Sequence, residues 1–486
     1  MRQRIQQVKA AMAAHGIHTL LTFDPKNVNY LTGFHTTARP IWQIGRTACL
    51  LSAGGTWRLF LPAPWDREYA PPPGCETVSY TGGDEELARA LCGHLPTDSR
   101  KRTAADLDAV PAPLYRALNR CGWGDQLTDA RLLLARCRMI KSPAEIRLLE
   151  QAVGLIDLGL KTAGQAVAEG AAEQEVQARI DAAMALAGSQ GCGFTTKVIS
   201  GPNGSYPHHV AGPRKITARS AVIVDLSASV SGYESDSART FLLPPGGGGG
   251  EEGGGEIRAA YGGRREMNGE ARAAYAGRQE VNGGAWAAYA GRQEINGGAW
   301  AAYAGHQEIN GGARAAYAGR QEINGEARAA YAGRQEVNGG ARAAYAGRQE
   351  INGEARAAYH ELLEMHHGIT ELLLSAGKRM KPGTPIRELH DFLRAELTRL
   401  NPAAVQAGTI GHGVGLRAHE YPDLTGDCPE LLAENMVLAV EPALYVPGRY
   451  GIRIENMFHI GPEGATTMNR YPLNRYDREG DDDGNL

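Results

Sequence analysis

The sequence has no long hydrophobic run and no clustered cysteines. No stretch of eighteen apolar residues occurs in its 486 residues, so no membrane-spanning helix is expected. The seven cysteines are scattered, odd in number and without Cys-x-x-Cys spacing, which favours a reducing compartment. The N-terminal residues form an amphipathic helix pattern rather than a secretory leader. We therefore expect a soluble, cytoplasmic protein.

The sequence also lacks a large excess of either charge. Its formal net charge is -3, and the basic residues are not grouped into blocks. Nucleic acid and anionic membranes are therefore poor candidates for partners. The length predicts two or three domains with enough apolar residues for a sizeable core.

What the sequence does contain is a segment, VIVDLSASVSGYESDSARTF at 222–241, that reads as a β-hairpin. A turn centred between Val230 and Ser231 would place Asp225 opposite Asp236. Opposed carboxylates on one ladder destabilise a hairpin unless a cation lies between them. A lone aspartate pair is more often a turn residue and a solvated residue, so this segment alone does not establish a metal site.

A second hairpin pattern is present in MVLAVEPALYVPGRYGIRIENMF at 436–458. Its presence makes it less adequate to explain the aspartates as one turn residue and one solvated residue. A turn centred on Gly448 would place Glu441 opposite Glu455. Between the two hairpins lies GHGVGLRAHE, which contributes the imidazole of His412. Four carboxylates and one imidazole suit a pair of divalent ions with mixed oxygen and nitrogen ligands.

The spacing D-x10-D, then G-H-G-x-G-L-x-x-H-E, V-E-P-x-L-Y and G-I-R-I-E, resembles the creatinase and prolidase superfamily of pita-bread metallohydrolases. It is most similar to the Xaa-Pro aminopeptidases and proline dipeptidases. The resemblance implies five ligands of a dinuclear metal centre: Asp225, Asp236, His412, Glu441 and Glu455. It also implies three residues that act beside the ligands: His208, His419 and Arg453.

The resemblance further implies a reaction. Two ions, with Mn2+ expected and Co2+ or Zn2+ possible, would activate a bridging hydroxide that cleaves the Xaa-Pro bond at the N-terminus of dipeptides or short peptides. Glu441 would carry protons, and His208 and His419 would stabilise the tetrahedral intermediate. A homodimer is expected. The alternatives are a small-molecule amidohydrolase or lyase on the same fold, of the creatinase or ectoine-derivative type, and a binding pseudoenzyme.

Departures from the family pattern are local. Leu226 and Ser227 stand where glycine commonly follows the first aspartate, and Ala443 stands where E-P-G is common. All five ligand positions are retained, so substrate fit rather than metal binding is open to question. His18, His35 and His94 are expected to be surface or core residues. His366 and His367 are expected to be solvated on a helix.

The sequence patterns divide the chain into two domains and an insertion within the second. Residues 1–135 alternate helix and strand signals, and NVNYLTGF there resembles the superfamily's N-terminal α/β domain. Residues 142–486 form the α+β pita-bread domain, with a helix start at Ser142-Pro143. A shift of 213 residues aligns two copies of a helix-helix-strand unit within it, which predicts an internal pseudo-two-fold duplication.

The catalytic domain is interrupted by a Gly-rich tandem-repeat insertion at 246–353. A unit close to RAAYAGRQEINGGA recurs there every 14 residues. Each unit has few apolar side chains to bury, and its Asn-Gly interrupts the helix pattern. We expect short helices or disorder in the repeats, and the last copy is expected to continue into a helix through EARAAYHELLEMHHG.

Overall fold

The computed structural model describes residues 1–35, 46–63, 69–96, 101–243, six short strands between 264 and 337, and 349–473. The chain divides into two compact units. The first comprises Met1–Gly247 and Leu362–Asn474, and the second comprises Gly248–Glu361 and Arg475–Leu486. No helix among the described residues is both long enough and apolar enough to cross a bilayer.

The N-terminal part of the first unit is built on a six-stranded mixed sheet in the order β4-β3-β2-β1-β5-β6. Its strands are β1 (Thr19–Thr22), β2 (Ala48–Ser52), β3 (Trp57–Pro62), β4 (Glu76–Tyr80), β5 (Thr103–Ala105) and β6 (Leu127–Asp129). Its helices are α1 (Arg2–Ala14), α2 (Pro25–Thr32), α3 (Asp84–Cys92), α4 (Ala112–Arg120) and α5 (Arg131–Met139). The predicted α/β alternation is thus present.

Both faces of this sheet are buried. Leu20 and Leu21, neighbours on β1, belong to different apolar clusters because successive side chains of a strand point to opposite faces. The cluster around Leu20 continues into the C-terminal half of the chain through Val414 and Met457. One core therefore joins the N-terminal sheet to the part of the fold that carries the carboxylate hairpins.

The helix start predicted at Ser142-Pro143 is confirmed. Helix α6 (Pro143–Ala166) has proline at its first position and a capping box, in which the Ser142 backbone N-H donates to Glu145 Oε2 at 2.8 Å. This satisfies backbone donors that the first turn of a helix leaves without partners. The same Glu145 accepts a hydrogen bond from Tyr233, so the start of α6 is tied to the first hairpin.

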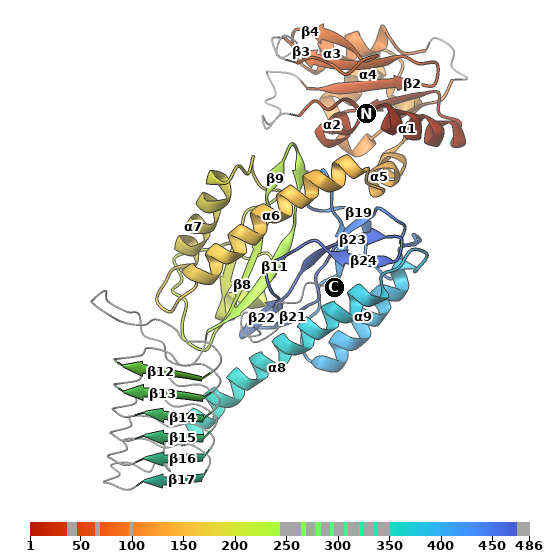
Figure 1. Cartoon of the computed structure of the whole chain (residues 1–486). Coiled ribbons are helices and arrows are strands. Elements are labelled where there is room, and N and C mark those ends of the chain that lie inside the picture. Colours follow the sequence, from red (N-terminus) through yellow and green to blue (C-terminus); the bar gives the residue numbers. More distant parts are fainter. Residues whose placement is uncertain are drawn as a thin grey trace. The chain divides into compact units, whose positions relative to one another are not determined.

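The predicted duplication appears in the helix boundaries. Helices α6 and α7 (Glu173–Leu186) have counterparts in α8 (Gln349–Arg379) and α9 (Ile386–Leu400). A shift of 213 residues carries the end of α6 onto the end of α8 and the start of α7 onto the start of α9. In Figure 1 these helices flank the strands between them. The expected helical continuation of the last repeat copy is confirmed, because α8 includes it.

The strands of this half form four sheets with the orders β10-β9, β11-β8-β7, β19-β18-β20-β23-β24 and β21-β22. Those of the first copy are β7 (Lys197–Ser200), β8 (Ala221–Leu226), β9 (Ser229–Val230), β10 (Tyr233–Glu234) and β11 (Ser237–Leu242). Those of the second are β18 (Gly411–Gly413), β19 (Glu420–Asp423), β20 (Val437–Val440), β21 (Ala443–Val446), β22 (Tyr450–Arg453), β23 (Asn456–Gly461) and β24 (Gly464–Thr467).

The register predicted for the first hairpin is wrong. Asp225 lies opposite Ala238, and Asp236 falls in the break between β10 and β11. The turn residues are Ser231 and Gly232, with φ of 50° and 81°. A two-residue turn of this left-handed kind matches strand twist, and it lies one residue further along the chain than predicted.

The register predicted for the second hairpin is confirmed. Ala443 pairs with Arg453 on one side, and Val440 pairs with Asn456 on the other. Glu441 and Glu455 therefore occupy matching positions in the gap between the two ladders. The turn is at Gly448, whose φ of 70° places it in the left-handed region that glycine adopts without strain.

The repeats form strands in the second unit, so the expectation of short helices or disorder is wrong for those residues. A six-stranded parallel sheet runs in the order β12-β13-β14-β15-β16-β17. The strands are β12 (Arg264–Asn268), β13 (Arg278–Asn282), β14 (Arg292–Ile295), β15 (His306–Ile309), β16 (Arg320–Ile323) and β17 (Arg334–Val337). Each residue pairs with its equivalent in the next copy, as Glu266 does with Glu280. Stacking supplies backbone partners that an isolated unit lacks.

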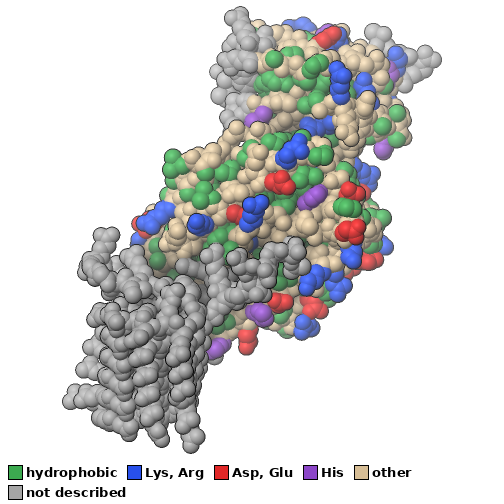
Figure 2. Space-filling view, in the orientation of Figure 1, with side chains coloured by type: hydrophobic (Ala, Val, Ile, Leu, Met, Phe, Trp, Pro, Cys, Tyr) green, Lys and Arg blue, Asp and Glu red, His purple; other side chains and the backbone are tan. Residues whose placement is uncertain are grey.

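Charge is mixed on the surface of the described residues. On the face shown in Figure 2, Lys and Arg side chains lie among Asp and Glu side chains, and hydrophobic side chains are scattered between them.

Candidate metal centre

The five predicted ligands come together from five separate points of the fold. Asp225 is near the end of β8 and His412 is in the middle of β18. Asp236, Glu441 and Glu455 each lie in a break between two strands. All are buried, with exposed fractions of 1%, 0%, 1%, 8% and 1% in that order. The cluster thus consists of four buried carboxylates and one buried imidazole.

Their atoms are close enough to share ions. Single ligand atoms of Asp225, Asp236 and Glu455 lie within 4.8 Å of one another, and so do those of Asp236, His412 and His419. Asp236 belongs to both groups and can bridge them. Glu441 reaches the second group, because its Oε1 is 3.6 Å from Nε2 of His412.

Several of these atoms have no hydrogen-bond partner among the described residues. They are Asp225 Oδ1, Asp236 Oδ2, His412 Nε2 and Glu455 Oε1, and all four are buried. Leaving one buried polar atom unsatisfied costs about 1–3 kcal/mol, and more where the group is charged. Cations held at the two groups of ligand atoms would satisfy all four of them, so the residues fit a divalent metal centre.

The electrostatics point the same way. Burial, Asp225 and Glu441 raise the pKa of Asp236 well above its ordinary value, and burial, Asp236 and Glu441 do the same for Glu455. The pKa of Glu441 is also raised, first by burial. These carboxylates repel one another and would be stabilised in their charged form by a metal ion.

His412 is prepared to act as a ligand. Burial and the neighbouring His419 ring lower the pKa of His412 to about 3, so its imidazole is neutral near pH 7. Its Nδ1-H donates to the carbonyl oxygen of Gly413 at 3.1 Å, which leaves the lone pair on Nε2 directed at the cluster.

Asp225 differs from the other carboxylates because two cations hold it. Arg453 Nη1 and Lys197 Nζ lie 2.5 and 2.7 Å from its Oδ2. Burial alone would raise the pKa of Asp225, but these two cations bring it below its ordinary value. Arg453 also donates to the Tyr445 hydroxyl and is only 5% exposed. Arg453 is therefore buried in contact with both Asp225 and Tyr445.

Of the two predicted catalytic histidines, His419 contacts the cluster directly, whereas His208 forms no hydrogen bond or ion pair with a candidate ligand among the described residues. The His419 side chain is 56% exposed, its Nε2 is 3.3 Å from Asp236 Oδ2, and its ring stacks on that of His412 at 3.6 Å. This brings His419 within reach of the ion position, closer than a residue outside the ligand set was expected to be. His208 is exposed, and burial together with Lys197 and Arg453 lowers its pKa.

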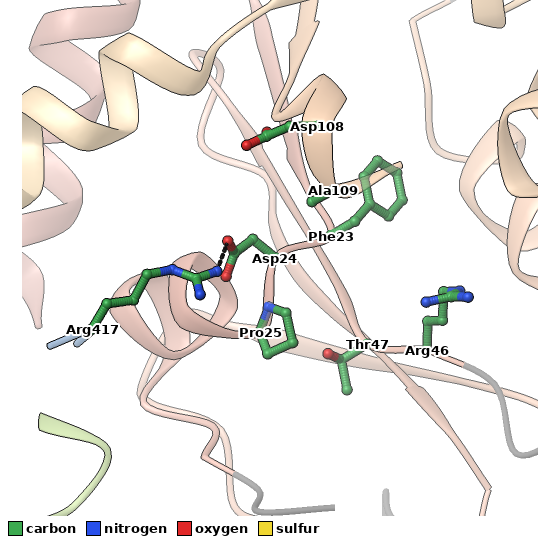
Figure 3. Close-up of a pocket in the computed structure, with 8 residues that line it drawn as sticks. All are labelled: Phe23, Asp24, Pro25, Arg46, Thr47, Asp108, Ala109 and Arg417. Carbon is green, nitrogen blue, oxygen red and sulfur yellow. Dashed lines mark hydrogen bonds and ion pairs between the residues drawn. The ribbon is translucent and has the colours of Figure 1, made fainter. Parts of the chain in front are cut away.

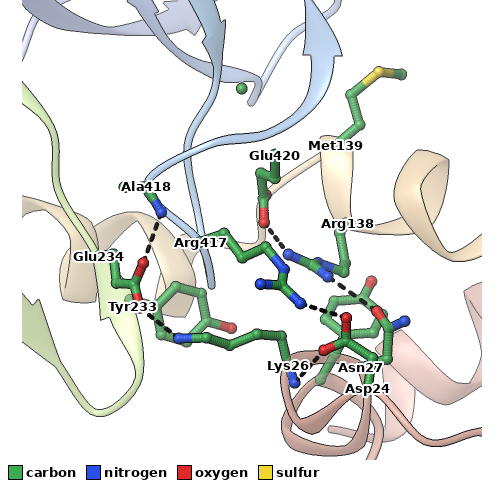
Figure 4. A network of polar contacts seen from close by, with 12 residues as sticks. Asp24, Lys26, Asn27, Arg138, Met139, Tyr233, Glu234, Arg417, Ala418 and Glu420 are labelled. Carbon is green, nitrogen blue, oxygen red and sulfur yellow. Dashed lines mark hydrogen bonds and ion pairs between the residues drawn. The ribbon is translucent and has the colours of Figure 1, made fainter. Parts of the chain in front are cut away.

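The loop that carries His419 is fastened on both sides, as Figure 4 shows. The backbone N-H of Ala418 donates to Glu234 Oε2 at 2.8 Å, and Lys26 Nζ donates to the other oxygen of Glu234 at 2.5 Å. Arg417 pairs with Asp24 of the N-terminal part. On the far side of His419, Glu420 is paired with Arg138 and Lys141.

The sequence did not single out Lys197 or Glu234. Lys197 is a lone lysine in a short apolar strand, and Glu234 reads as an ordinary turn-flanking acid. The assignment of His366 as solvated is also wrong, since it is 4% exposed and its Nε2 lies 3.0 Å from the Thr240 carbonyl oxygen. His367 is exposed, as expected. His18, His35 and His94 belong to neither group of candidate ligand atoms.

A separate pocket of about 240 Å³ lies beside the N-terminal sheet (Figure 3). Phe23, Asp24 and Pro25 line it at the end of β1, and Arg46 lies across from them. Arg46 is itself paired with Asp84. None of the five predicted ligands borders this pocket, so it is distinct from the carboxylate cluster.

Comparison with known proteins defines the class of the chain. Residues 147–274 and 341–462 match Metallopeptidase family M24, and residues 4–140 match the Creatinase/Prolidase N-terminal domain. The chain therefore belongs to the M24 metallopeptidases. It combines a creatinase-type α/β domain with a pita-bread catalytic domain.

Individual relatives are distant. YkvY of Bacillus subtilis, whose name assigns it provisionally to the dipeptidases, is 24% identical over 96% of this chain and 98% of its own length. The Xaa-Pro dipeptidase of Pyrococcus furiosus is 22% identical over 68% of this chain and 64% of its own. The prolidase structure from Pyrococcus horikoshii covers 98% of this chain and 99% of its own, at a TM-score of 0.64 and 18% identity.

Proposed function

We propose that this protein is a dinuclear metallopeptidase that hydrolyses the Xaa-Pro bond at the N-terminus of dipeptides or short peptides. The observation that carries the proposal is the set of four buried, unpartnered ligand atoms on Asp225, Asp236, His412 and Glu455. Membership of the M24 metallopeptidases supplies the reaction class. The proline preference rests on the prolyl peptidases among the relatives.

The ligand set would be Asp225, Asp236, His412, Glu441 and Glu455, with Mn2+ as the expected metal. When bound, two divalent ions supply an acidified water molecule and a Lewis acid that polarises the scissile carbonyl. Asp236 would serve both groups of ligand atoms, because its carboxylate belongs to each of them. His419, whose Nε2 reaches Asp236, can adjust between ligand and substrate contact.

Glu441 is suited to move the proton. At 8% it is the most exposed of the four carboxylates, and burial is the first cause of its raised pKa. It would take a proton from the attacking water and deliver it to the nitrogen of the departing proline. Arg453 Nε lies 3.6 Å from Glu441 Oε2 and would hold the carboxylate in place.

His419 and His208 would bind the substrate carbonyl oxygen as it becomes an oxyanion. Both are exposed, and both lie close enough to Asp225 and Arg453 for those charges to affect their pKa values. The Phe194 ring meets the His419 ring edge to face, with centroids 6.4 Å apart, and limits where that imidazole can point. Donors placed in this way stabilise the charge that develops in acyl transfer.

A substrate panel tests the proposal. The purified protein, stripped with chelator and reloaded with Mn2+, should release the first residue from Xaa-Pro peptides much faster than from matched Xaa-Ala peptides, because a tertiary amide without an N-H has to be accommodated. His419→Ala should lower kcat by roughly 100-fold or more, the scale of one lost oxyanion donor. Equal, slow cleavage of both peptide series, with fast turnover of an amidated small molecule, would replace the peptidase by the amidohydrolase alternative.

A further inference from the structure

The six-stranded repeat sheet of the second unit has no part in the proposed hydrolysis. Its strands β12 to β17 begin at intervals of 14 residues and pair in parallel, always between equivalent residues of neighbouring copies. Figure 1 shows them as one stack of arrows. Each strand therefore joins the sheet by pairing with a copy of itself, and any further copy of the same sequence can pair in the same way.

The last strand of the stack has the sequence of an inner strand. Strand β17 reads RQEV, and so does β13, which pairs with β12 on one side and with β14 on the other. Among the described strands, β17 pairs only with β16, and β12 pairs only with β13. Repeat proteins normally end in atypical copies that stop further stacking. Strand β17 is not such a cap, because its sequence pairs on both sides elsewhere in the same sheet.

The chain does not continue this pattern at either end of the stack. The copy after β17 is Arg-Gln-Glu-Ile at 348–351, and from Gln349 onward it belongs to helix α8. Fourteen residues before β12 the sequence at 250–254 is Gly-Glu-Glu-Gly-Gly, which does not repeat the strand. The outer row of backbone groups on an edge strand is a template for pairing with another chain. A strand of the matching sequence is available from a second copy of the protein.

The charges of the strands do not oppose such pairing. The six strands together contain six arginines and six glutamates, so they carry no excess of either sign. Residues of a strand alternate between faces, which places Arg278 and Glu280 on the same face. A row of glutamates in register is destabilising by itself, but here it lies beside a row of arginines. A further strand would meet the balance that the six described strands already have.

We propose that β17 of one molecule pairs with β12 of a second molecule, in parallel and in register, so that their repeat sheets form one continuous sheet. Two different edges meet in this contact, so every joined molecule still presents a free edge and the assembly is open-ended. Each junction adds one strand pair of four or five residues, and an interface of this size is weak. Association should therefore grow with protein concentration in the micromolar to millimolar range. The inference goes beyond the proposed function and does not depend on it.

The test is sedimentation velocity of the full-length protein over a concentration series, with electron microscopy of the same samples. The mass of the wild type should increase with concentration. Met267→Lys alters the β12 edge, and Val337→Lys alters the β17 edge. Each puts a charge into the row of Met, Val and Ile positions, and a charge of this kind on an edge strand prevents edge-to-edge pairing. Each variant alone should lose the increase in mass, because every junction needs one edge of each kind.

Mixing the two variants identifies the edges that meet. Met267→Lys keeps a native β17 edge, and Val337→Lys keeps a native β12 edge. An equimolar mixture should therefore recover the association that neither variant shows alone. A contact between two like edges predicts a different result, in which one variant associates by itself and mixing adds nothing. That result would overturn the proposal, and so would a wild-type mass that does not change with concentration.

Leu186→Lys is the matched control, because it introduces the same charge at an apolar residue that is 91% exposed at the end of α7. It should associate as the wild type does. A variant that lacks 246–353, with Pro245 joined to Glu354, removes both edges and should show no increase in mass with concentration. This variant keeps the test decisive if a lysine variant is not folded by circular dichroism, since an unchanged increase in mass without the repeats would refute the junction. All measurements are made without substrate, so their outcome is separate from that of the peptidase assay.

Discussion

Replacing Asp236 by asparagine separates two effects of the carboxylate cluster: the charge repulsion that lowers the stability of the fold, and the binding of metal that raises it. Asp236 is 1% exposed, and its pKa is raised by burial and by the charges of Asp225 and Glu441. In chelator, Asp236→Asn removes a repelled charge and keeps the shape of the side chain, so the variant should unfold at the same or a higher temperature than the wild type. With Mn2+ present, the order should reverse, because only the wild type gains the free energy of binding.

The size of the gain follows from mass action. An ion at 100 times its Kd stabilises the folded state by about 2.7 kcal/mol. For a domain of roughly 150–250 residues, 1 kcal/mol shifts Tm by about 2–4 °C, so Mn2+ should raise the wild-type Tm by roughly 5–10 °C. Thermal unfolding in chelator and in Mn2+ measures both effects. Asp391→Asn, at an exposed carboxylate, is the control and should follow the wild type.

The dependence on pH has a definite sign. The folded-state pKa values of Asp236 and Glu455 are raised, so their contribution to stability is full below the ordinary carboxyl pKa and is lost as pH rises through the raised values. In chelator, the Tm advantage of Asp236→Asn over the wild type should therefore grow between about pH 5 and pH 8. A variant less stable than the wild type in chelator, or one that Mn2+ stabilises equally, would contradict the ligand role of Asp236.

Two further predictions concern the surroundings of the site. Lys26→Met should lower kcat by roughly 10- to 100-fold with unchanged bound Mn2+, because it frees Glu234 and with it the loop that positions His419. Steady-state kinetics together with metal analysis checks this prediction. Loss of bound metal would place the defect at the ligands instead. Deleting residues 246–353 and joining Pro245 to Glu354 should leave a folded, metal-dependent enzyme, because the family match omits 275–340 and loop closure depends weakly on length. An insoluble or inactive deletion variant would make the repeats structural.

Much of the fold was predictable because its signals are local. The proline and capping box at the start of α6 and the glycine turn of the second hairpin each lie within a few residues. The first hairpin was misread for a local reason too. Its turn uses Ser231 at positive φ, a conformation that sequence patterns assign to glycine, asparagine or aspartate. Ser231 and Gly232 were recognisable as turn residues, but the sequence did not show that the turn is centred between them rather than between Val230 and Ser231.

What the sequence could not indicate depends on pairing between distant segments. Lys197 becomes part of the centre only through the register of β7 against β8, 28 residues away, and Glu234 only through a contact with Ala418. The strands of the repeats depend in the same way on neighbouring copies, since one 14-residue unit cannot satisfy its own backbone groups. Such partners are supplied by topology rather than by local propensity.

The breaks in the ladders explain how one centre can be built from two copies of a hairpin. Residues paired within a continuous ladder share a fixed spacing and a fixed face, which would hold opposed carboxylates in contact. Three of the four carboxylates proposed as ligands, Asp236, Glu441 and Glu455, lie instead where pairing is interrupted, so their backbone can turn the side chains inward. Asp225 alone remains in a ladder, and it alone is balanced by two cations. Of the carboxylates in the ladder breaks, Glu441 contacts Arg453, and Asp236 and Glu455 have no ion pair with Lys or Arg among the described residues. The charges of these last two are therefore the ones that a metal ion would have to balance.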